Sequence, residues 1–476
     1  MFEGVLASLK ESLDFISGLV WGPWFLIPLL LGTGLFLSVR LRLIQFRSLG
    51  PALRLALLQR RDDAGGGDIS QFQALTTALA ATVGVGNIVG VATAISVGGP
   101  GALFWMWVTG LAGMASKYAE AFLGVRFRTT DARGEKSGGP QYYLERGIRG
   151  PFGKFLALWF AIFAAIASFG IGNMTQGNAV AVQAEEAFRI APVVTGVVLT
   201  LLTGVVLLGG IKSIGRVTAG FVPLMIGLYL LFGSWVLVAN GPQLPAALGR
   251  VFSEAFTGSA ATGGFIGSVF MLAVQMGVAR GIFSNESGMG SAAIAAAAAQ
   301  TSHPTRQGLV SMTQTFIDTI IVVTFTGLIV ISSGVWTQGK SEAGLMTSQA
   351  FREGLPGEWG HLIVAVAVVF FAFSTMLGWA YYGERCTERL LGIRGVFAYR
   401  VVFTIIVFIG CTVPLELVWS FADVMNGLMA VPNLIGLLVL SGLVARETRH
   451  YLEHDPKLRA SSAEVDVFMS GHERHD

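Results

Sequence analysis

The chain consists of long apolar runs separated by short polar and charged segments. A helix needs about 20 mostly apolar residues to cross the hydrocarbon core of a membrane. Eleven runs come close to that length or exceed it, so the pattern predicts eleven membrane-spanning helices. The predicted spans are Leu19–Val39, Ala74–Val97, Gly101–Val125, Phe155–Ala184, Ala191–Gly209, Thr218–Ala239, Gly263–Ala299, Gly308–Ser332, His361–Tyr381, Val396–Thr412 and Leu417–Val444.

The composition also indicates a membrane protein. Of the 476 residues, 53% are hydrophobic and 13% are charged, whereas soluble domains carry about 25% charged residues. So little charge cannot cover a water-exposed surface, and most of the outer face must therefore meet lipid. The net charge of +3 is too small for a nucleic-acid-binding surface. The two cysteines, Cys386 and Cys411, are too few for a disulfide scaffold and have no partners at metal-ligand spacing.

Lys and Arg are concentrated in alternate loops of this predicted topology. Twenty-five of the 32 basic side chains fall on one side, five fall on the other, and two lie inside spans. Short cytoplasmic loops are enriched in Lys and Arg, so the first side is predicted to be cytoplasmic. We therefore expect a multi-pass protein of the cytoplasmic membrane with its N-terminus outside and its C-terminus in the cytoplasm.

The spans and loops divide the chain into four parts, none of them a separate soluble domain. Residues 1–64 contain the first span and a basic segment, Arg42–Asp63, expected to form an amphipathic helix on the cytoplasmic membrane surface. Residues 68–240 and 258–446 contain five spans each. Residues 447–476 form a polar cytoplasmic tail that is expected to be partly disordered.

Two predicted spans carry glycines beside polar residues at mid-membrane, around Gly84 in the second and around Gly281 in the seventh. Glycine tolerates unwound backbone, and polar side chains at membrane depth are costly unless they face a protein interior. Each set of five spans therefore begins with a helix that we expect to be interrupted, and the two sets enter the membrane from opposite sides. This inverted-repeat pattern is typical of secondary transporters, which bind substrate and ions at such interruptions.

Charged side chains also occur inside these spans. Arg280 and Glu286 in the seventh span either pair with each other to hold the interrupted helix or contact substrate directly. Pairing is favoured, because charged side chains inside a membrane usually form ion pairs with one another. Lys117 and Glu120 lie one helical turn apart in the third span and are expected to form a similar pair.

Long stretches of this chain closely resemble the alanine or glycine:cation symporter family: TVGVGNIVGVATAISVGGPG from Thr82, FWMWVTGLAGMASKYAE from Phe104 and RGIFSNESGMGSA from Arg280. The resemblance covers nearly the whole chain. It implies an all-α polytopic fold of about 11 transmembrane helices, in which a five-plus-five inverted repeat of the sodium-coupled amino-acid transporter type follows one extra N-terminal helix. It also implies sodium-driven import of alanine or glycine.

The resemblance implies a set of sodium ligands, and sodium as a hard cation prefers oxygen. They come from the first interruption and from a Ser-Thr pair on the ninth span. The alternative interpretation of this pair is that its hydroxyls only form hydrogen bonds to carbonyls of their own helix. The implied ligands are backbone carbonyls of Ala80, Thr82, Val83 and Phe371, the amide oxygen of Asn87, and the hydroxyls of Ser374 and Thr375.

A zwitterionic amino acid needs donors for its carboxylate and acceptors for its ammonium group, and the unwound backbones at Gly84, Gly86 and Gly281 can offer both. Side chains are expected to add hydrogen bonds or to exclude large substrates by their bulk, with Trp379 as the preferred wall. The side chains expected around the substrate are Thr82, Asn173, Gln176, Gln275, Phe283 and Trp379.

Three alternatives to a sodium symporter follow from the same residues: a proton-coupled symporter, a channel and an enzyme. Proton coupling would need carboxylates, for which Glu286, Asp318 and Glu384 are the candidates. A channel would need a continuous polar lining instead of two separate interruptions. An enzyme is not expected, because the chain has no hydrolase or metalloprotease motif. We expect sodium as a co-transported ligand, no covalent cofactor and no obligate protein partner.

Overall fold

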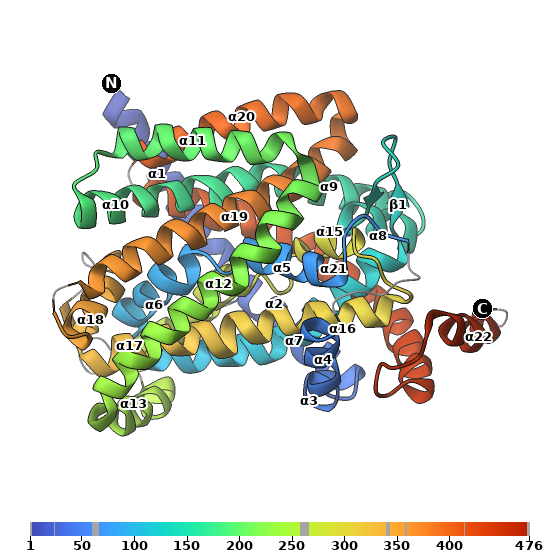
Figure 1. The fold of residues 1–476 in the computed structure, drawn as a ribbon, viewed down its shortest axis with the longest axis horizontal. Coiled ribbons are helices and arrows are strands. Elements are labelled where there is room, and N and C mark those ends of the chain that lie inside the picture. The colour runs from blue at the N-terminus through green and yellow to red at the C-terminus, as the bar shows by residue number, and fades with distance from the viewer. Residues whose placement is uncertain are drawn as a thin grey trace.

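The computed structural model describes residues 2–22, 24–59, 66–257, 266–338, 343–357, 359–413 and 415–473. The fold is almost entirely helical (Figure 1). The first half contains α1 (Phe2–Val20), α2 (Leu26–Arg40), α3 (Ile44–Arg47), α4 (Leu49–Leu57), α5 (Gln71–Thr82), α6 (Val91–Gly98), α7 (Gly101–Arg126), β1 (Thr129–Thr130), β2 (Lys136–Ser137), α8 (Pro140–Gly147), α9 (Pro151–Phe169), α10 (Thr175–Phe188), α11 (Pro192–Leu208), α12 (Gly210–Ala239) and α13 (Leu244–Thr257). The second half contains α14 (Ile266–Asn285), α15 (Ala292–Ala297), α16 (Pro304–Thr315), α17 (Thr324–Ser333), α18 (Met346–Gly354), α19 (Gly360–Leu391), α20 (Ile393–Thr412), α21 (Leu415–His454) and α22 (Ser462–Glu473).

Wider π-helical turns continue or join several of these helices. They cover Gly86–Gly90, Gly170–Met174 and Phe316–Val323, and short 3-10 helices cover Gly241–Gln243 and Val335–Gln338. A π turn is rare and tends to occur at functional sites. The two strands form a small antiparallel hairpin between α7 and α8.

Six helical segments of the described residues are long and apolar enough to cross a membrane, and a bent pair raises that number to seven. They match six of the predicted spans: Pro151–Phe188, Gly210–Ala239, Pro304–Ser333, Gly360–Leu391, Ile393–Thr412 and Val418–His454. The bent pair is the predicted second span. Two other predicted spans correspond to apolar helices of 15 and 17 residues, α2 and α11. A multi-pass membrane protein is thereby supported, and the count of eleven stays a prediction.

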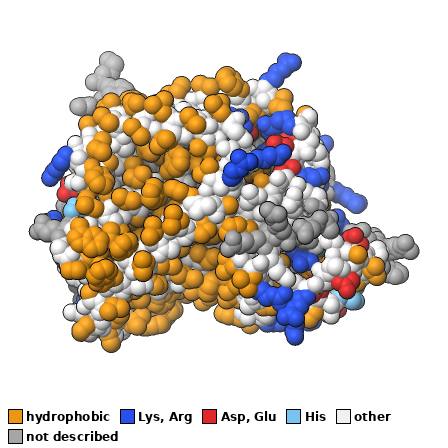
Figure 2. Space-filling model, in the orientation of Figure 1, with side chains coloured by type: hydrophobic (Ala, Val, Ile, Leu, Met, Phe, Trp, Pro, Cys, Tyr) orange, Lys and Arg blue, Asp and Glu red, His pale blue; other side chains and the backbone are white. Residues whose placement is uncertain are grey.

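The helices surround two central ones that are buried along much of their length. α7 packs against α2, α14, α15 and α16, and α19 packs against α5, α9, α10, α12 and α20. α11 and α20 lie side by side at one edge of the bundle (Figure 1). Hydrophobic side chains cover most of the face over α10, α11, α12 and α19, and the visible Lys and Arg gather mainly at the end that carries β1, α8 and α22 (Figure 2).

The first predicted span begins differently from its prediction. α1 continues to Val20, the chain bends, and α2 begins only at Leu26. The bend is held to the second half of the chain, because Trp21 donates its indole N–H to the carbonyl of Asp423 at 2.8 Å. The amphipathic segment after α2 is also two short helices, α3 and α4, instead of one; its last residues, 60–63, lie outside the described part.

The tail is more ordered than predicted. α21 runs beyond the predicted span to His454, and α22 packs back against it. Tyr451 is fully buried and stacks on His303, and Arg306 donates to the carbonyl of Ala460 at 2.8 Å. The expectation of disorder is therefore wrong for residues 447–473, because apolar side chains hidden among the polar ones pack against the loop before α16.

A cluster of ion pairs holds the hairpin to the end of α19. Arg385 is 1% exposed and bonds Asp131 at 2.7 Å and Glu388 at 3.0 Å, and Glu135 as well. Arg133 of the hairpin reaches Glu388 at 3.0 Å. Removing one partner from a buried ion pair leaves the other charges uncompensated and costs about 3–5 kcal/mol.

Arg385→Gln is expected to lower the free energy of unfolding by an amount of that order, because three carboxylates lose their shared cation. Thermal unfolding of the detergent-solubilised protein measures the effect. Arg394→Gln is the matched control, because Arg394 is exposed at the start of α20. Equal midpoints for both variants would show that the cluster contributes no stability.

Candidate functional site

The first interrupted helix is present where the sequence predicts it. α5 ends at Thr82, and Val83 and Gly84 are not helical. Helical structure then resumes, and the segment Gly86–Gly98, which contains the π turn and α6, is bent by 52° relative to α5. Side chains satisfy two backbone N–H groups in the gap. Gly84 donates to the Asn87 amide oxygen at 2.9 Å, and Val85 donates to the Gln176 amide oxygen at 3.2 Å.

Four oxygen atoms meet beside this gap. The hydroxyl of Thr375 donates to the carbonyls of Ala80 and Phe371, each at 2.9 Å. The hydroxyl of Ser374 lies 2.9 Å from the carbonyl of Phe371 and 3.4 Å from that of Ala80. α5 contributes the carbonyl of Ala80, and α19 contributes the two hydroxyls and the carbonyl of Phe371. Both hydroxyls thus also bond back to their own helix, as in the alternative interpretation, and all four residues are buried.

Two glycines allow close approach at the gap. A β-carbon on Gly84 would collide with the hydroxyl of Thr375, and one on Gly86 would lie 3.2 Å from the ring of Phe283. Glycine is needed here for space, since both residues are fully enclosed. Phe283 in turn packs on Trp419, with ring centroids 4.6 Å apart.

The second interruption lies later in the chain than predicted. α14 is continuous through Gly277 and Gly281 to Asn285, and the backbone turns only at Glu286, Gly288 and Gly290, which have φ of 55°, 92° and 84°. Gly281 instead packs against α7, where a β-carbon would meet the hydroxyl of Thr109. Glycine allows a kink without requiring one, and close helix packing accounts for this residue.

The turn at Glu286 is held by side chains from two other helices and by Ser291, which lies just before α15. Its carboxylate accepts from Trp379 of α19 and from Ser291, each at 2.6 Å. Its carbonyl accepts from Lys117 of α7 at 3.1 Å. The predicted Lys117–Glu120 pair is confirmed, with a separation of 3.9 Å and both side chains fully buried.

Glu120 extends this network to α21. One of its carboxylate oxygens accepts from the N–H of Gly290 at 3.0 Å and from the Asn433 amide at 2.8 Å. The Asn433 amide also donates to the carbonyl of Gly288 at 2.8 Å. The carbonyls of Glu286 and Gly288 and the N–H of Gly290 therefore each have a buried polar side chain as a partner, as an apolar surrounding requires.

The favoured Arg280–Glu286 pair is wrong. Arg280 instead forms a bidentate pair with Asp423 of α21, at 2.8 and 3.1 Å. Its guanidinium also lies over the ring of Trp419, 4.5 Å from the centroid. One turn of helix separates Arg280 from the turn at Glu286, and α21 offers a carboxylate on the side that Arg280 faces.

Asp318 joins the two interruptions directly. It accepts from Asn87 of the first at 2.7 Å and from Ser284 beside the second at 2.9 Å, and from Thr319 at 2.8 Å. Gln314, one turn earlier on α16, makes the same connection by donating to the hydroxyl of Thr82 at 2.8 Å and to the carbonyl of Asn285 at 3.2 Å.

A third irregular segment, the π turn Gly170–Met174, faces the first gap. Gln176 follows it and bonds both Val85 and, at 2.8 Å, the carbonyl of Ile171. Asn173 points the other way and donates to the carbonyl of Phe403 on α20 at 2.7 Å. Its amide oxygen is buried with no hydrogen-bond partner among the described residues.

Comparison with known proteins identifies the family of this chain. Residues 6–465 match the sequence profile of the sodium:alanine symporter family. The chain belongs to this family. It is thus a sodium-coupled amino-acid symporter of the multi-pass membrane type.

Several relatives of this family are similar over almost their whole length. The sodium/alanine symporter AgcS of Methanococcus maripaludis is 51% identical, over 93% of this chain and 98% of the relative. The probable sodium/glutamine symporter GlnT of Bacillus subtilis is 36% identical, over 93% and 91%. The putative sodium/proton-dependent alanine carrier protein YrbD of the same organism is 35% identical, over 90% of each chain.

Among solved structures, a mutant form of the manganese transporter of Eremococcus coleocola shares the fold. It superposes with a TM-score of 0.50 at 18% identity and covers 81% of each chain. At this identity the likeness concerns the course of the helices only. It places the symporter family in a helical architecture that another transporter also uses.

Most of the side chains predicted for the site meet around the two interruptions. Gln176 lies at the first gap, Phe283 covers Gly86, and Trp379 bonds Glu286. Gln275 lies elsewhere, because its amide donates to the carbonyl of Trp21 at the bend before α2. Thr82 has its hydroxyl turned to Ala78 and Gln314, away from the Ser374–Thr375 pair.

Three residues of this network are not among the residues expected from the sequence: Gln314, Asn433 and Tyr143. Tyr143 donates its hydroxyl to the Asn433 amide oxygen. Gln314 and Asn433 were visible as polar residues inside apolar spans, a signal that was used only for the glycine-rich spans. Tyr143 lies in α8, between two predicted spans, and nothing in the sequence marks it.

Gly84→Ala is expected to reduce sodium-dependent alanine uptake by about tenfold or more, because overpacking costs about 1–3 kcal/mol and the added methyl collides with the Thr375 hydroxyl. Uptake into proteoliposomes measures the change. Gly227→Ala on α12 is the matched control, because no atom lies within 4 Å of the added carbon. Normal uptake by the Gly84 variant would mean that α5 and α19 separate easily at this contact.

Proposed function

We propose that this symporter imports alanine, glycine or both together with sodium by alternating access. The observation that carries the proposal is the meeting of the Ser374 and Thr375 hydroxyls with the carbonyls of Ala80 and Phe371 beside an unwound helix. The architecture proposed for it is a five-plus-five inverted repeat, residues 68–240 and 258–446, preceded by one extra helix. The N-terminus is proposed to lie outside and the C-terminus in the cytoplasm.

The proposed sodium site uses these four oxygens and the carbonyl of Val83. Sodium is a hard cation and binds oxygen ligands whether or not they carry a charge. When sodium binds, its contacts with the hydroxyl and carbonyl oxygens would replace the hydrogen bonds that the hydroxyls now make to the carbonyls. Asn87 is proposed as a ligand near a second cation. Its amide oxygen already accepts from Gly84, so a cation there would share that oxygen with the backbone.

The proposed amino-acid site lies between the two interruptions. The gap at Gly84–Gly86 supplies backbone groups, Gln176 supplies an amide, and Trp379 and Phe283 limit the volume. Because Phe283 already lies against Gly86, a substrate with a large side chain would have to displace this ring and its partner Trp419. A small amino acid such as alanine or glycine fits this restriction best.

Coupling follows from the shared gap. Sodium at Ala80 and substrate at Gly84 would fix the same unwound segment, so each ligand improves the affinity for the other. Residues of α18 cover the gap from one side: Thr347 donates to the carbonyl of Ile88 at 3.1 Å, and Ser348 donates to Gln183 at 2.8 Å. In the proposed topology this is the outer side, so the conformation resembles one closed to the outside.

Proton coupling is a second candidate, favoured by the surroundings of Asp318. This fully buried carboxylate is bonded to Asn87, Ser284 and Thr319, which carry no charge. None of these three partners is a cation, so this carboxylate is the candidate carrier of a transported proton. Glu384, the third candidate from the sequence, is bonded to Arg400 in the ion-pair cluster at the end of α19 and is a weaker candidate.

Uptake of labelled alanine and glycine into proteoliposomes tests the proposal. An inward sodium gradient is compared with an equal potassium gradient and with a proton gradient alone. Accumulation above equilibrium only with sodium is the expected result. Accumulation with protons alone would replace sodium by proton coupling, and simple equilibration would contradict symport.

Thr375→Val is expected to raise the sodium concentration for half-maximal uptake by about tenfold or more, because a hydrogen-bonding contact to a charge is worth about 1.5–3 kcal/mol. Valine keeps the shape and removes the oxygen. Thr404→Val is the control, because that hydroxyl bonds only its own helix in the described structure. An unchanged sodium dependence at saturating alanine would remove Thr375 from the site.

Asp318→Asn separates the two candidates. An asparagine can keep all three hydrogen bonds if its NH₂ donates to the hydroxyls of Ser284 and Thr319. We therefore expect the variant to retain sodium-driven uptake, and the dependence of this uptake on pH to be the same as in the unsubstituted protein. If sodium-driven uptake survives but a proton-driven component disappears, Asp318 carries a proton during transport.

A further inference from the structure

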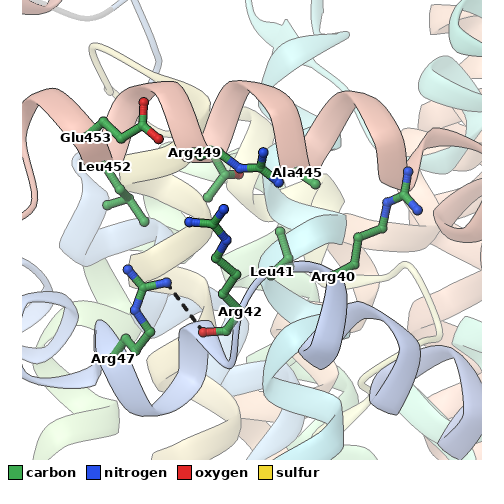
Figure 3. A pocket seen from close by; sticks show the side chains of 9 residues that line it. Arg40, Leu41, Arg42, Arg47, Ala445, Arg449, Leu452 and Glu453 are labelled. Atoms are coloured by element: carbon green, nitrogen blue, oxygen red, sulfur yellow. Dashed lines mark hydrogen bonds between the residues drawn. The ribbon is translucent and has the colours of Figure 1, made fainter.

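A cluster of arginines lies where the end of α2 and the segment before α4 meet the last turns of α21. Its pocket has a volume of about 70 Å³ and is lined by Arg40, Leu41, Arg42, Arg47, Ala445, Thr448, Arg449, Leu452 and Glu453. A second hollow of about 530 Å³ shares Arg40, Ala445, Arg449 and Glu453 and adds Arg446 and His450. Figure 3 shows the side chains of Arg42, Arg47 and Arg449 extending into the same space.

The pocket carries an excess of positive charge. Among the described residues, no ion pair joins Arg40, Arg42, Arg47 or Arg449 to a carboxylate, and Glu453 is the one acidic residue in the lining. Nearby Glu447 is already bonded to Arg126 at 3.1 Å. The side chains of Arg42, Arg47 and Arg449 extend toward one another in Figure 3, with Arg40 of α2 further along α21, and like charges placed close together favour the binding of an anion between them.

The backbone that presents these arginines is strained. Arg42 and Leu43 have φ of 55° and 54°, a conformation that residues other than glycine seldom adopt, and here two occur in succession. The turn reverses the chain between α2 and α3 and brings Arg47 back within 3.5 Å of the carbonyl of Arg42. Strain at consecutive residues persists where surrounding structure requires it and tends to mark functional positions.

Exposed apolar side chains border the arginines on the same helices. The guanidinium of Arg40 lies over the ring of Phe36, 5.6 Å from its centroid, and Phe36, Leu43 and Phe46 are 42%, 48% and 61% exposed. Surfaces of this kind in a membrane protein face acyl chains. The arginines therefore lie at the level where a hydrocarbon surface gives way to polar surface.

We propose that this pocket binds the phosphate group of an anionic phospholipid whose acyl chains lie along Phe36, Leu43 and Phe46. Charge complementarity and the adjoining apolar surface together select this ligand, because a free phosphate would use the arginines and leave the apolar surface unmatched. Basic pockets between membrane helices suit such headgroups. The site links α2, which precedes the first repeat, to α21, which ends the second.

Native mass spectrometry of the purified full-length protein, titrated with lipid in detergent, tests the proposal independently of transport. Phosphatidylglycerol is compared with phosphatidylcholine and with inorganic phosphate. The expected result is stoichiometric retention of phosphatidylglycerol and much weaker retention of the other two. Equal retention of phosphatidylcholine would overturn the proposal, and equal occupancy by inorganic phosphate would replace the lipid by a free anion.

Arg42→Gln with Arg449→Gln is expected to weaken phosphatidylglycerol binding by about 30-fold, which corresponds to about 2 kcal/mol for two arginines. The control removes the same charge at Arg149 and Arg394, which are exposed and line neither pocket. Equal losses in both double variants would mean that the lipid responds to overall charge and not to this pocket.

Glu453→Gln provides a test that misfolding cannot imitate. Removing the acidic residue from the lining is expected to tighten phosphatidylglycerol binding by about fivefold. A misfolded protein would lose affinity instead of gaining it. Unchanged or weaker binding by this variant would place the headgroup outside the pocket.

Discussion

The structure depends on satisfying backbone polar groups where helices stop inside an apolar surrounding. A carbonyl or N–H without a partner costs several kcal/mol there, and the chain interrupts two helices near its centre. It supplies partners from elsewhere: Asn87 and Gln176 serve the first interruption, and Glu120, Lys117 and Asn433 serve the second. The polar residues that look expensive in the apolar spans are therefore what makes the interruptions possible.

This requirement also connects parts of the chain that are far apart. Asp318 and Gln314 each bond both interruptions, so α16 with its π turn is the element through which the two communicate. A ligand that reshapes the gap at Gly84 must change the hydrogen bonds of Asn87, and through Asp318 those of Ser284. Energetic coupling thus has a short physical route made of named contacts.

Sequence patterns located the first interruption and the Lys117–Glu120 pair, because each has a local signal: glycines beside polar residues, and charges one turn apart. The Ser374–Thr375 pair has no such signal and was indicated only by the family resemblance. The patterns misplaced the second interruption because glycine permits an irregular backbone without demanding it. At Gly281 the glycine serves helix packing, while the turn falls on Glu286, a residue with no intrinsic preference for it. The Arg280–Asp423 pair was invisible because its partners come from different helices, and the order of the tail depends on contacts of Tyr451 that a local reading cannot foresee.

The backbone conformation of Glu286 depends on the position of α19. Its left-handed backbone conformation costs about 1–3 kcal/mol, and the hydrogen bond from Trp379 ties that conformation to α19. If α19 moves away from the second interruption, the bond that offsets the cost is lost and the turn can relax toward ordinary helix. The backbone of Glu286 would then have two conformations, and the position of α19 would decide which of them it adopts. The carboxylate would thereby couple the second interruption to the movement of α19.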